Sequence, residues 1–283
     1  MFSFDPKNLE LRQLHNLMIG SVAPRPIAMV STQSKDGKDN LAPFSFFNAF
    51  SSNPPIVAFS PAKRGRDGTF KDTYNNLVET KECVVHIVTY AIVEQMNVTS
   101  TEYSTGVDEF VKSGFTKIKS NVVKPFRAKE SPVHFECKLL QMVPLGDKNA
   151  SGNLAICEVV QIHINENIFI DGKVVVEKVD QVGRNGGSYY TRAFGSSLFE
   201  VHQPNKDLGI GYDQLPKAFR ESHELSANDL GQLATVLQEP TLAESKEFIK
   251  KLNFKDLLAT AKVFLKLRRT AEAYKVLLAY YQK

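Results

Sequence analysis

The stretch APFSFFNAFSSNPP, residues 42–55, decides how the fold of this sequence is interpreted. Phenylalanines are mixed with serine and asparagine without regular alternation, and a double proline ends the run. A half-buried strand alternates apolar and polar residues, and a fully buried strand is apolar throughout, so this stretch fits neither pattern. Rings next to small hydrogen-bonding groups therefore need an explanation beyond core packing.

Strand-like segments lie on both sides of this stretch. The segments expected to be strands are 26–32, 54–61, 82–89, 132–146, 152–170 and 172–184. Short helices are expected within 1–20, at 71–81 (with Asp72 or Thr73 as N-cap), at 90–100 and at 107–114. Turns rather than regular crossover helices join most of the strands, so the sequence predicts a mainly β fold with an antiparallel sheet or barrel.

The sequence changes character after residue 195. Glycine and proline punctuate residues 195–219, which we expect to be a linker. Helical signals follow from Ser226, among them Thr241 and Glu244 at capping-box spacing. One helical face carries several apolar residues, namely Leu257, Leu258, Ala261, Phe264 and Leu265.

These patterns predict two parts of the chain. Residues 1–195 are expected to form the β domain, and residues 196–283 a linker with an α-helical C-terminal extension. Such an extension is expected to stabilise the fold or to extend a dimer interface.

The composition is that of a globular protein. The 283 residues are 42% hydrophobic and 23% charged, and the net charge of +4 is too small and too evenly spread for a nucleic-acid or anionic-membrane surface. Three widely spaced cysteines lie in apolar runs without a CxxC pair, so buried thiols and a cytoplasmic location are expected. No signal peptide or membrane-spanning segment is expected either.

The common catalytic and metal-binding motifs are missing from the sequence. There is no GxxxxGK[ST], no GxGxxG after a strand, no HExxH and no GxSxG. The six histidines form no ligand pair at helical or tight-turn spacing, so a metal site is not expected.

The remaining candidate for chemistry is the block from Arg25 to Asn76. It combines hydroxyls and amides, phenylalanine rings, and cations that precede a helix start: Ser31, Thr32, Asn40, Ser45, Asn48, Ser60; Phe44, Phe46, Phe47; Arg64, Arg66, Lys71, Asp72 and Thr73. A helix N-terminus beside cations binds anions, so the block suits a flat ligand with a phosphate at one end. A phenylalanine-rich core strand beside a basic loop is the alternative interpretation.

Four pieces of the sequence, in this order and spacing, resemble the flavin reductase-like, FMN-binding split-barrel family. They are PRPIAMVST (24–32), GKDNLAPFSFFNAFSSNPPIVAFS (37–60), FKDTYNN (70–76) and ECVVHIV (82–88). VGRNGGSYY (182–190) is similar to a late segment of that family. The resemblance covers about residues 12–195 and implies a six-stranded antiparallel Greek-key split barrel, usually a homodimer with FMN near the subunit interface.

The resemblance also implies which residues bind the cofactor. Ser31, Thr32, Asn40, Ala42, Ser45, Phe46 and Phe47 correspond to the flavin cradle. Ser60, Lys71, Asp72 and Thr73 fall near the phosphate, Arg25 at the pocket mouth, and Tyr189 or Tyr190 where the pocket would close. No side chain is assigned as a catalytic acid or base, because the cofactor itself carries out the redox step.

The family's activity implies that NADH or NADPH passes a hydride to the flavin, which then reduces an acceptor, for example an electron-acceptor protein or a partner monooxygenase. One alternative is a non-catalytic FMN protein that carries electrons to a protein partner. Another is a barrel without flavin that serves as an interaction module.

Overall fold

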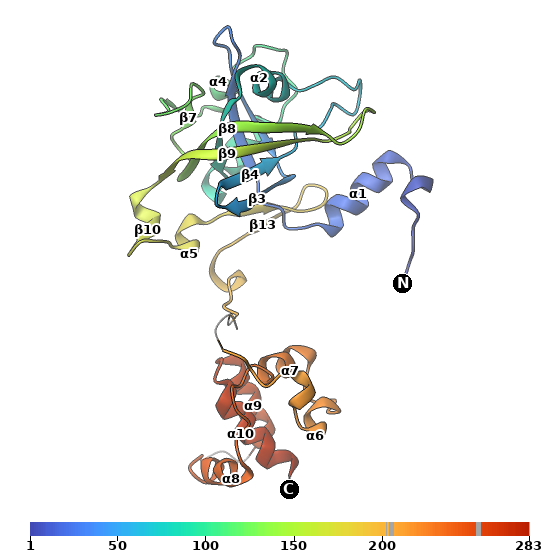
Figure 1. The fold of residues 1–283 in the computed structure, drawn as a ribbon, viewed down its shortest axis with the longest axis vertical. Coiled ribbons are helices and arrows are strands. Elements are labelled where there is room, and N and C mark those ends of the chain that lie inside the picture. Colours follow the sequence, from blue (N-terminus) through green and yellow to red (C-terminus); the bar gives the residue numbers. More distant parts are fainter. Residues whose placement is uncertain (202, 204–206, 253–255, 283) are drawn as a thin grey trace. The chain divides into compact units, whose positions relative to one another are not determined.

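A computed structural model describes residues 1–201, 203, 207–252 and 256–282. The chain divides into two compact units, residues 1–199 and 200–283 (Figure 1). The first unit contains all the strands of the described residues, and the second is helical. None of the helices in the described ranges is long and apolar enough to cross a membrane.

A seven-stranded antiparallel sheet forms the body of the first unit. Its strands are β1 (Ala28–Gln33), β2 (Asp39–Phe44), β3 (Phe47–Ser52), β4 (Pro55–Phe59), β5 (Glu82–Ile87), β8 (Val133–Pro144) and β9 (Asn153–Ile164). They are ordered β2-β1-β5-β8-β9-β4-β3, and every neighbouring pair is antiparallel. The mainly β, antiparallel prediction is therefore confirmed, with one strand more than the six expected.

The additional strand arises in the stretch that opened the sequence analysis. We expected one strand there, but the chain bends at Ser45 and Phe46 and separates β2 from β3. These two strands are consecutive in the chain, yet they are the two outer strands of the sheet. The sheet therefore has to curl until its edges approach each other at this corner, although no ladder pairs β2 with β3 in the part of the chain that the structure describes.

The interior of the curled sheet is a hydrophobic cluster with contributions from six of its seven strands. Phe44 at the end of β2 meets Phe59 of β4 with ring centroids 5.4 Å apart, so side chains from near the two edges meet inside the sheet. All three cysteines, Cys83, Cys137 and Cys157, are buried in this cluster as free thiols, as the sequence predicts. Burial of these apolar groups is the main stabilising contribution to the unit.

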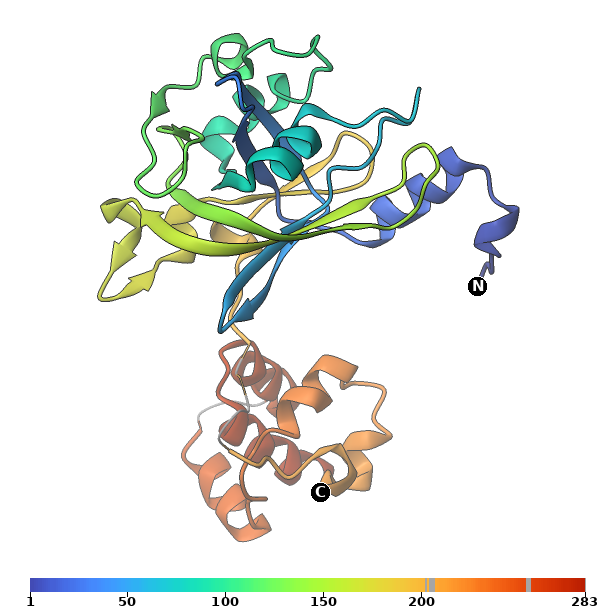
Figure 2. The same ribbon diagram turned by 45° about the horizontal axis from the view of Figure 1, so that its top comes forward.

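Short helices lie around the sheet. They are η1 (Pro6–Asn8), α1 (Leu11–Ser21), α2 (Asp72–Thr80), η2 (Tyr90–Ile92), α3 (Val93–Val98), α4 (Glu109–Ser113), η3 (Glu166–Ile168), α5 (Val176–Val179) and η4 (Gly195–Ser197). Helix α2 packs against β1 and α4 against β2, whereas α1 extends away from the sheet in both views (Figures 1 and 2). The N-cap of α2 is Lys71, one residue before the expected positions Asp72 or Thr73.

Three two-stranded sheets complete this unit. They are β6 (Lys117–Ile118) with β7 (Arg127–Ala128), β10 (Phe169–Ile170) with β11 (Lys173–Val174), and β12 (Val182–Arg184) with β13 (Tyr190–Arg192). The prediction of a single strand over residues 172–184 is therefore wrong. The helical turn α5 interrupts it, and Asp180 ends that turn in the left-handed backbone region (φ 52°).

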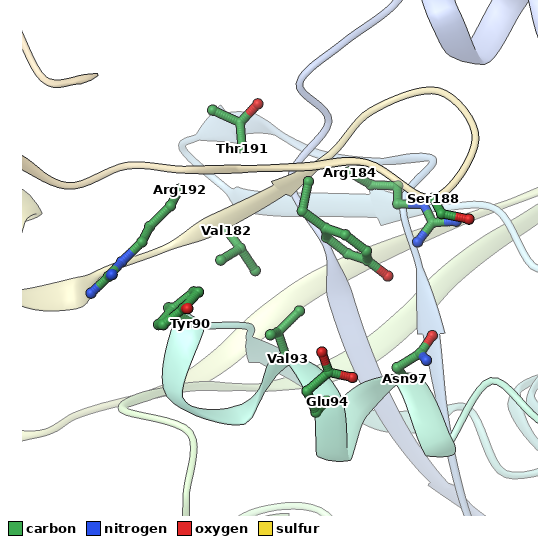
Figure 3. A pocket seen from close by; sticks show the side chains of 10 residues that line it. Tyr90, Val93, Glu94, Asn97, Val182, Arg184, Ser188, Thr191 and Arg192 are labelled. Atoms are coloured by element: carbon green, nitrogen blue, oxygen red, sulfur yellow. The ribbon is translucent and has the colours of Figure 1, made fainter.

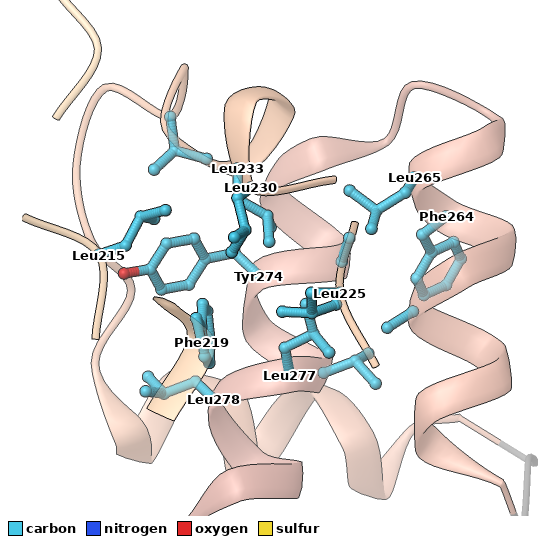
Figure 4. Packing of buried hydrophobic residues seen from close by; sticks show 14 of the residues in the cluster. Leu215, Phe219, Leu225, Leu230, Leu233, Phe264, Leu265, Tyr274, Leu277 and Leu278 are labelled. Atoms are coloured by element: carbon cyan, nitrogen blue, oxygen red, sulfur yellow. The ribbon is translucent and has the colours of Figure 1, made fainter. Parts of the chain in front are cut away.

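The second unit has its own hydrophobic core. Its helices are η5 (Tyr212–Gln214), α6 (Lys217–Arg220), α7 (Ala227–Leu233), α8 (Leu242–Lys250), α9 (Leu257–Lys266) and α10 (Thr270–Tyr281). Helices α7 and α8 begin with capping boxes, and that of α8 joins Thr241 to Glu244 as predicted. Leu215 and Phe219 pack in the core beside Tyr274 and Leu277 (Figure 4), so the end of the expected linker belongs to this unit.

A polar network holds a long loop against the sheet of the first unit. Three histidines, His86, His134 and His163, lie side by side on β5, β8 and β9. The backbone N–H of Ala128 donates to His86 Nε2 (2.9 Å), and the carbonyl of Ala128 lies 3.0 Å from His134 Nε2. The fully buried Glu136 accepts hydrogen bonds from the backbone N–H groups of residues 121–123 and lies 2.6 Å from His163 Nε2.

Burial makes this network sensitive to acid. It lowers the pKa of His86 to about 3 and that of His134 to about 4, so both are neutral in the folded protein at pH 7. Burial also acts to raise the pKa of Glu136, but the backbone donors and His163 offset it and leave that pKa below its ordinary value. Each of these groups binds protons more readily in the unfolded chain, so acid favours unfolding.

We therefore expect the melting temperature to fall as the pH drops from about 6.5 to about 4, since an unfolded histidine has a pKa of about 6.5. His134 alone contributes roughly 2–3 kcal/mol over that range. Thermal unfolding followed by circular dichroism should show a flatter pH profile for His134→Gln. His15→Gln, at an exposed position on α1, should leave the profile unchanged, and an equally steep profile for His134→Gln would contradict this account.

Candidate functional site

A pocket lies beside the start of α2. Its wall combines β2, the loop before α2, the first residues of α2, the turn after α3 and the start of α4. The lining residues are Asn40, Ala42, Pro43, Arg64, Lys71, Asp72, Thr73, Thr99, Ser100, Thr101, Glu102, Tyr103 and Glu109. The structure thus brings five of the predicted binding residues, Asn40, Ala42, Lys71, Asp72 and Thr73, into one pocket.

Buried hydrogen bonds fix one side of this pocket. Asn40 Nδ2 donates to Thr32 Oγ1 (3.1 Å) and to Thr73 Oγ1 (3.0 Å). Asn76 Nδ2 donates to the same Thr32 hydroxyl at 3.0 Å. The network therefore ties β1, β2 and α2 together, with Thr32 standing behind Asn40 and outside the lining of the pocket.

Two cations in the pocket have no acidic partner. Among the residues that the structure describes, neither Lys71 nor Arg64 has a carboxylate oxygen within 4.0 Å. Arg64 instead donates to Thr69 Oγ1 and to the carbonyl of Phe70. Burial, and to a lesser degree the charge of Arg64, lower the pKa of Lys71 despite an opposing effect of Glu102. A bound anion would relieve the unfavourable burial of these like charges.

Backbone donors point to the same place. The N-cap of α2, Lys71, makes no side-chain capping bond, and its carbonyl accepts from the N–H groups of Tyr74 and Asn75. Within the described ranges, no acceptor meets the N–H groups of Asp72 and Thr73. The first N–H groups of a helix lack intrahelical partners and carry partial positive charge, so they add to the anion-binding character of the pocket.

Carboxylates also line the pocket, namely Asp72, Glu102 and Glu109. Glu109 is buried and accepts a hydrogen bond from the N–H of Leu41 (3.0 Å), and its pKa is raised by burial despite that bond. Asp72 Oδ1 accepts from the hydroxyl of Thr105 at 3.1 Å. The pocket therefore combines cations and donors with acceptors, which suits a ligand that carries both a phosphate and hydroxyl groups.

Two predicted hydroxyls bond to the protein itself and are outside the lining of the pocket. Ser31 is fully buried and donates from Oγ to the carbonyl of Phe126 at 2.6 Å. Ser60 Oγ accepts from the N–H of Asn153 at 3.1 Å, at the end of the β8–β9 hairpin. These contacts hold β1 and β4 to neighbouring segments.

The remaining cradle residues lie at the corner where β2 passes into β3. Ser45 is half-buried, Phe47 begins β3, and Phe46 is 46% exposed. The buried Arg25 lies next to them, with its Nε 3.5 Å from Ser45 Oγ and its Cζ 5.8 Å from the Phe46 ring centroid.

Arg25 mainly bonds to backbone. Its guanidinium donates to the carbonyls of Ile19, Val22 and Asn185, and its own backbone pairs with that of Arg184. Arg25 thereby ties the corner to the end of α1 and to the β12–β13 hairpin.

The two late tyrosines differ in position. Tyr189 is 78% exposed in the turn of the β12–β13 hairpin and does not line the pocket beside α2. Tyr190 lines a second pocket, between α3 and that hairpin (Figure 3).

Some residues that line the pocket, or that support it from behind as Asn76 does through Thr32, are absent from the sequence-based assignment. Asn76 stands three residues after Thr73, on the same helical face, so its spacing could have indicated a role. Glu109 and the segment 99–103 carry no motif and approach the pocket only through the fold.

Comparisons with known proteins show which family the chain resembles. Residues 19–177 match the family described as flavin reductase like domain. A relative from Aquifex aeolicus (strain VF5) is 42% identical over 189 residues, which are 66% of this chain and 94% of that relative.

Two solved structures are similar to this chain. Nitrilotriacetate monooxygenase component B from Bacillus cereus is 31% identical, with a TM-score of 0.66, and the match covers 72% of this chain and 98% of that one. The 2-nitrobenzoate 2-nitroreductase NbaA from Pseudomonas fluorescens is 26% identical, with a TM-score of 0.64 and coverage of 77% and 100%. The resemblance noted in the sequence is confirmed, and the chain belongs to the flavin reductase-like family.

Proposed function

We propose that this chain binds FMN, with the phosphate at the start of α2, and oxidises NADH or NADPH. The observation that carries the proposal is the pair Lys71 and Arg64, two cations without an acidic partner in the described residues, beside the unbonded first N–H groups of α2. A dianionic phosphate would accept from all of these donors.

The rest of the pocket fits the other parts of FMN. Asp72 and Glu109 would accept hydrogen bonds from ribityl hydroxyls. Ala42 and Pro43 lead from the pocket toward Ser45 and the corner, where small side chains and exposed backbone would let a flat ring approach. Larger side chains at these positions would block that approach.

Bound FMN would supply the hydride-accepting ring, so the chain needs no acid or base of its own for that step. The role of the protein would be to hold the phosphate, to orient the ring and to donate N–H groups to the ring oxygens as charge develops. A partner monooxygenase, or an organic molecule that accepts electrons, would then reoxidise the flavin. The solved relatives support this range of acceptors, because one is a monooxygenase component and the other a nitroreductase.

A homodimer forms part of the proposal. Strand β3 is an outer strand of the sheet, and its residues from Asn48 to Ser52 are exposed. Phe50 is 66% exposed on this strand. An edge strand with exposed rings is a site for pairing with another chain. A second copy here would also cover the corner where the flavin ring is proposed to lie.

Replacing Lys71 and Thr73 together by alanine should weaken FMN binding by about 1–3 kcal/mol, because charge-assisted hydrogen bonds to the phosphate are lost. Fluorescence titration of free FMN would measure this change. Lys35→Ala with Thr80→Ala removes the same kinds of groups near the other end of α2, since Lys35 pairs with Glu79, and should leave the affinity unchanged. Equal affinities for both double variants would remove Lys71 and Thr73 from the site.

The visible absorption spectrum tests the activity. Protein loaded with FMN should show oxidised-flavin bands that bleach promptly when NADH or NADPH is added without oxygen. Bands that persist with both nucleotides but bleach with dithionite would contradict the oxidation of NADH or NADPH by the bound flavin. They would favour an electron carrier instead. Protein that shows no flavin bands after incubation with FMN and removal of the unbound FMN, and that does not bind FMN in the fluorescence titration, would overturn the flavin proposal itself.

Light scattering tests the dimer. The wild-type chain should have twice the mass of one chain, and Phe50→Asp should shift it toward the monomer, because a buried charge opposes association. Phe169→Asp places the same charge at an exposed position on β10 and should leave the mass unchanged. A monomeric wild-type protein at micromolar concentration would refute this part of the proposal.

A further inference from the structure

The second pocket of the first unit is separate from the one assigned to FMN. It has a volume of about 390 Å³ and lies between helix α3 and the β12–β13 hairpin (Figure 3). Helix α3 supplies one wall and the hairpin the other, with Val182 at the buried base. The size is that of a site for a small organic molecule rather than for a whole dinucleotide.

One cation at this pocket is already neutralised. Arg192 makes two hydrogen bonds to the carboxylate of Asp180, at 2.6 and 2.7 Å. Its Cζ also lies 3.9 Å from the ring centroid of Tyr90. The charges of Arg192 and Asp180 therefore compensate each other without a ligand. Arg192 also packs on the ring of Tyr90 at the edge of the pocket.

Arg184 has no such partner. Its Cζ lies 4.5 Å from the ring centroid of Tyr190, its neighbour across the hairpin, and its Nη2 donates to the carbonyl of Gly187 at 2.7 Å. No carboxylate oxygen lies within 4.0 Å of it in the part of the chain that the structure describes. Burial and the charge of Arg184 lower the pKa of Arg25, whose guanidinium also bonds only to neutral groups. Two neighbouring guanidiniums therefore leave positive charge uncompensated on the hairpin side.

The opposite wall accepts hydrogen bonds. Glu94 and Asn97 rise from exposed positions of α3 toward the hairpin (Figure 3). Glu94 forms no ion pair with any residue that the structure describes. A ligand with an anionic group on one edge and an N–H or O–H group on the other would satisfy both walls, while Tyr190 and Val93 offer apolar surface between them.

We propose that this pocket binds a planar aromatic molecule that carries a carboxylate or phosphate group, with Arg184 holding the anion and Glu94 accepting an N–H or O–H from the opposite edge. The aromatic ring lies against Tyr190. A nicotinamide nucleotide and a small aromatic acid share this chemistry. A role of the ligand as electron donor or acceptor rests on the proposed function, whereas its binding does not.

Calorimetric titration of the full-length protein, with and without FMN, tests the proposal. Nicotinamide mononucleotide is the probe for a nicotinamide nucleotide, and 4-aminobenzoate is the probe for a small aromatic acid. At least one of the two should bind. Arg184→Gln should weaken that binding about tenfold or more, because a charge-assisted hydrogen bond is lost. Arg268→Gln removes an exposed arginine of the helical unit and should have no effect.

Matched ligands provide an independent measurement. The neutral 4-aminobenzamide should bind the wild-type protein at least tenfold more weakly than 4-aminobenzoate, if the aromatic acid is the better probe. Glu94→Gln should weaken 4-aminobenzoate but not benzoate, which lacks the amino group. If nicotinamide mononucleotide is the better probe, nicotinamide riboside, which lacks the phosphate, should bind at least tenfold more weakly. One of these two comparisons decides the question even where Arg184→Gln fails to fold.

The outcomes separate this inference from the proposed function. Unchanged probe binding by a folded Arg184→Gln variant, or no binding of either probe to the wild-type protein at millimolar concentration, overturns the inference. FMN titration of the same proteins reports separately on the pocket beside α2, so loss of one site is distinguishable from loss of the other.

Discussion

The bend at Ser45 and Phe46 is the constraint on which the first unit depends. Because two residues connect β2 to β3, and these are the outer strands of the sheet, seven strands have to curl around one interior. Phe44 and Phe59 can then meet inside. The same bend leaves Ser45 half-buried and Phe46 exposed at the corner, where the flavin ring is proposed to lie. Core packing explains the buried Phe44, and the proposed ligand would explain why small polar residues stand beside the rings of residues 42–55.

Polar side chains inside this unit mostly position other parts of the chain. Ser31 and Arg25 bond to the carbonyls of Phe126 and Asn185, which are far away in the sequence, and Glu136 bonds to N–H groups of the loop before β8. Such bonds satisfy buried polar groups that would otherwise cost free energy, and they fix loops that have few apolar contacts. Cations that lack a carboxylate partner among the described residues are therefore informative, and Lys71, Arg64 and Arg184 are such cations that line a pocket.

The sequence predicts the class of fold and part of the site. Some residues of the pocket can be predicted from local features of the sequence. Asn40 lies within a recognisable strand segment, and Lys71 and Thr73 lie at a recognisable helix start. Glu109 and residues 99–103 cannot be predicted in this way, since only tertiary packing brings them to the pocket. The split of residues 42–55 into two strands also escapes local patterns, because the bend depends on where β2 and β3 find partners. A similar argument applies to Phe219, which a glycine- and proline-rich context marks as linker although it packs in a core.

The half-buried Lys71, which has no carboxylate partner among the described residues, has a consequence for how the protein would behave in solution. A small oxyanion in the pocket would relieve the repulsion between Lys71 and Arg64 and so stabilise the folded state by mass action. If the proposed FMN site is correct, phosphate or sulfate in a buffer would compete with the flavin rather than be an inert component. The apparent affinity for FMN, and the melting temperature of the flavin-free protein, would then depend on which anion the solution contains.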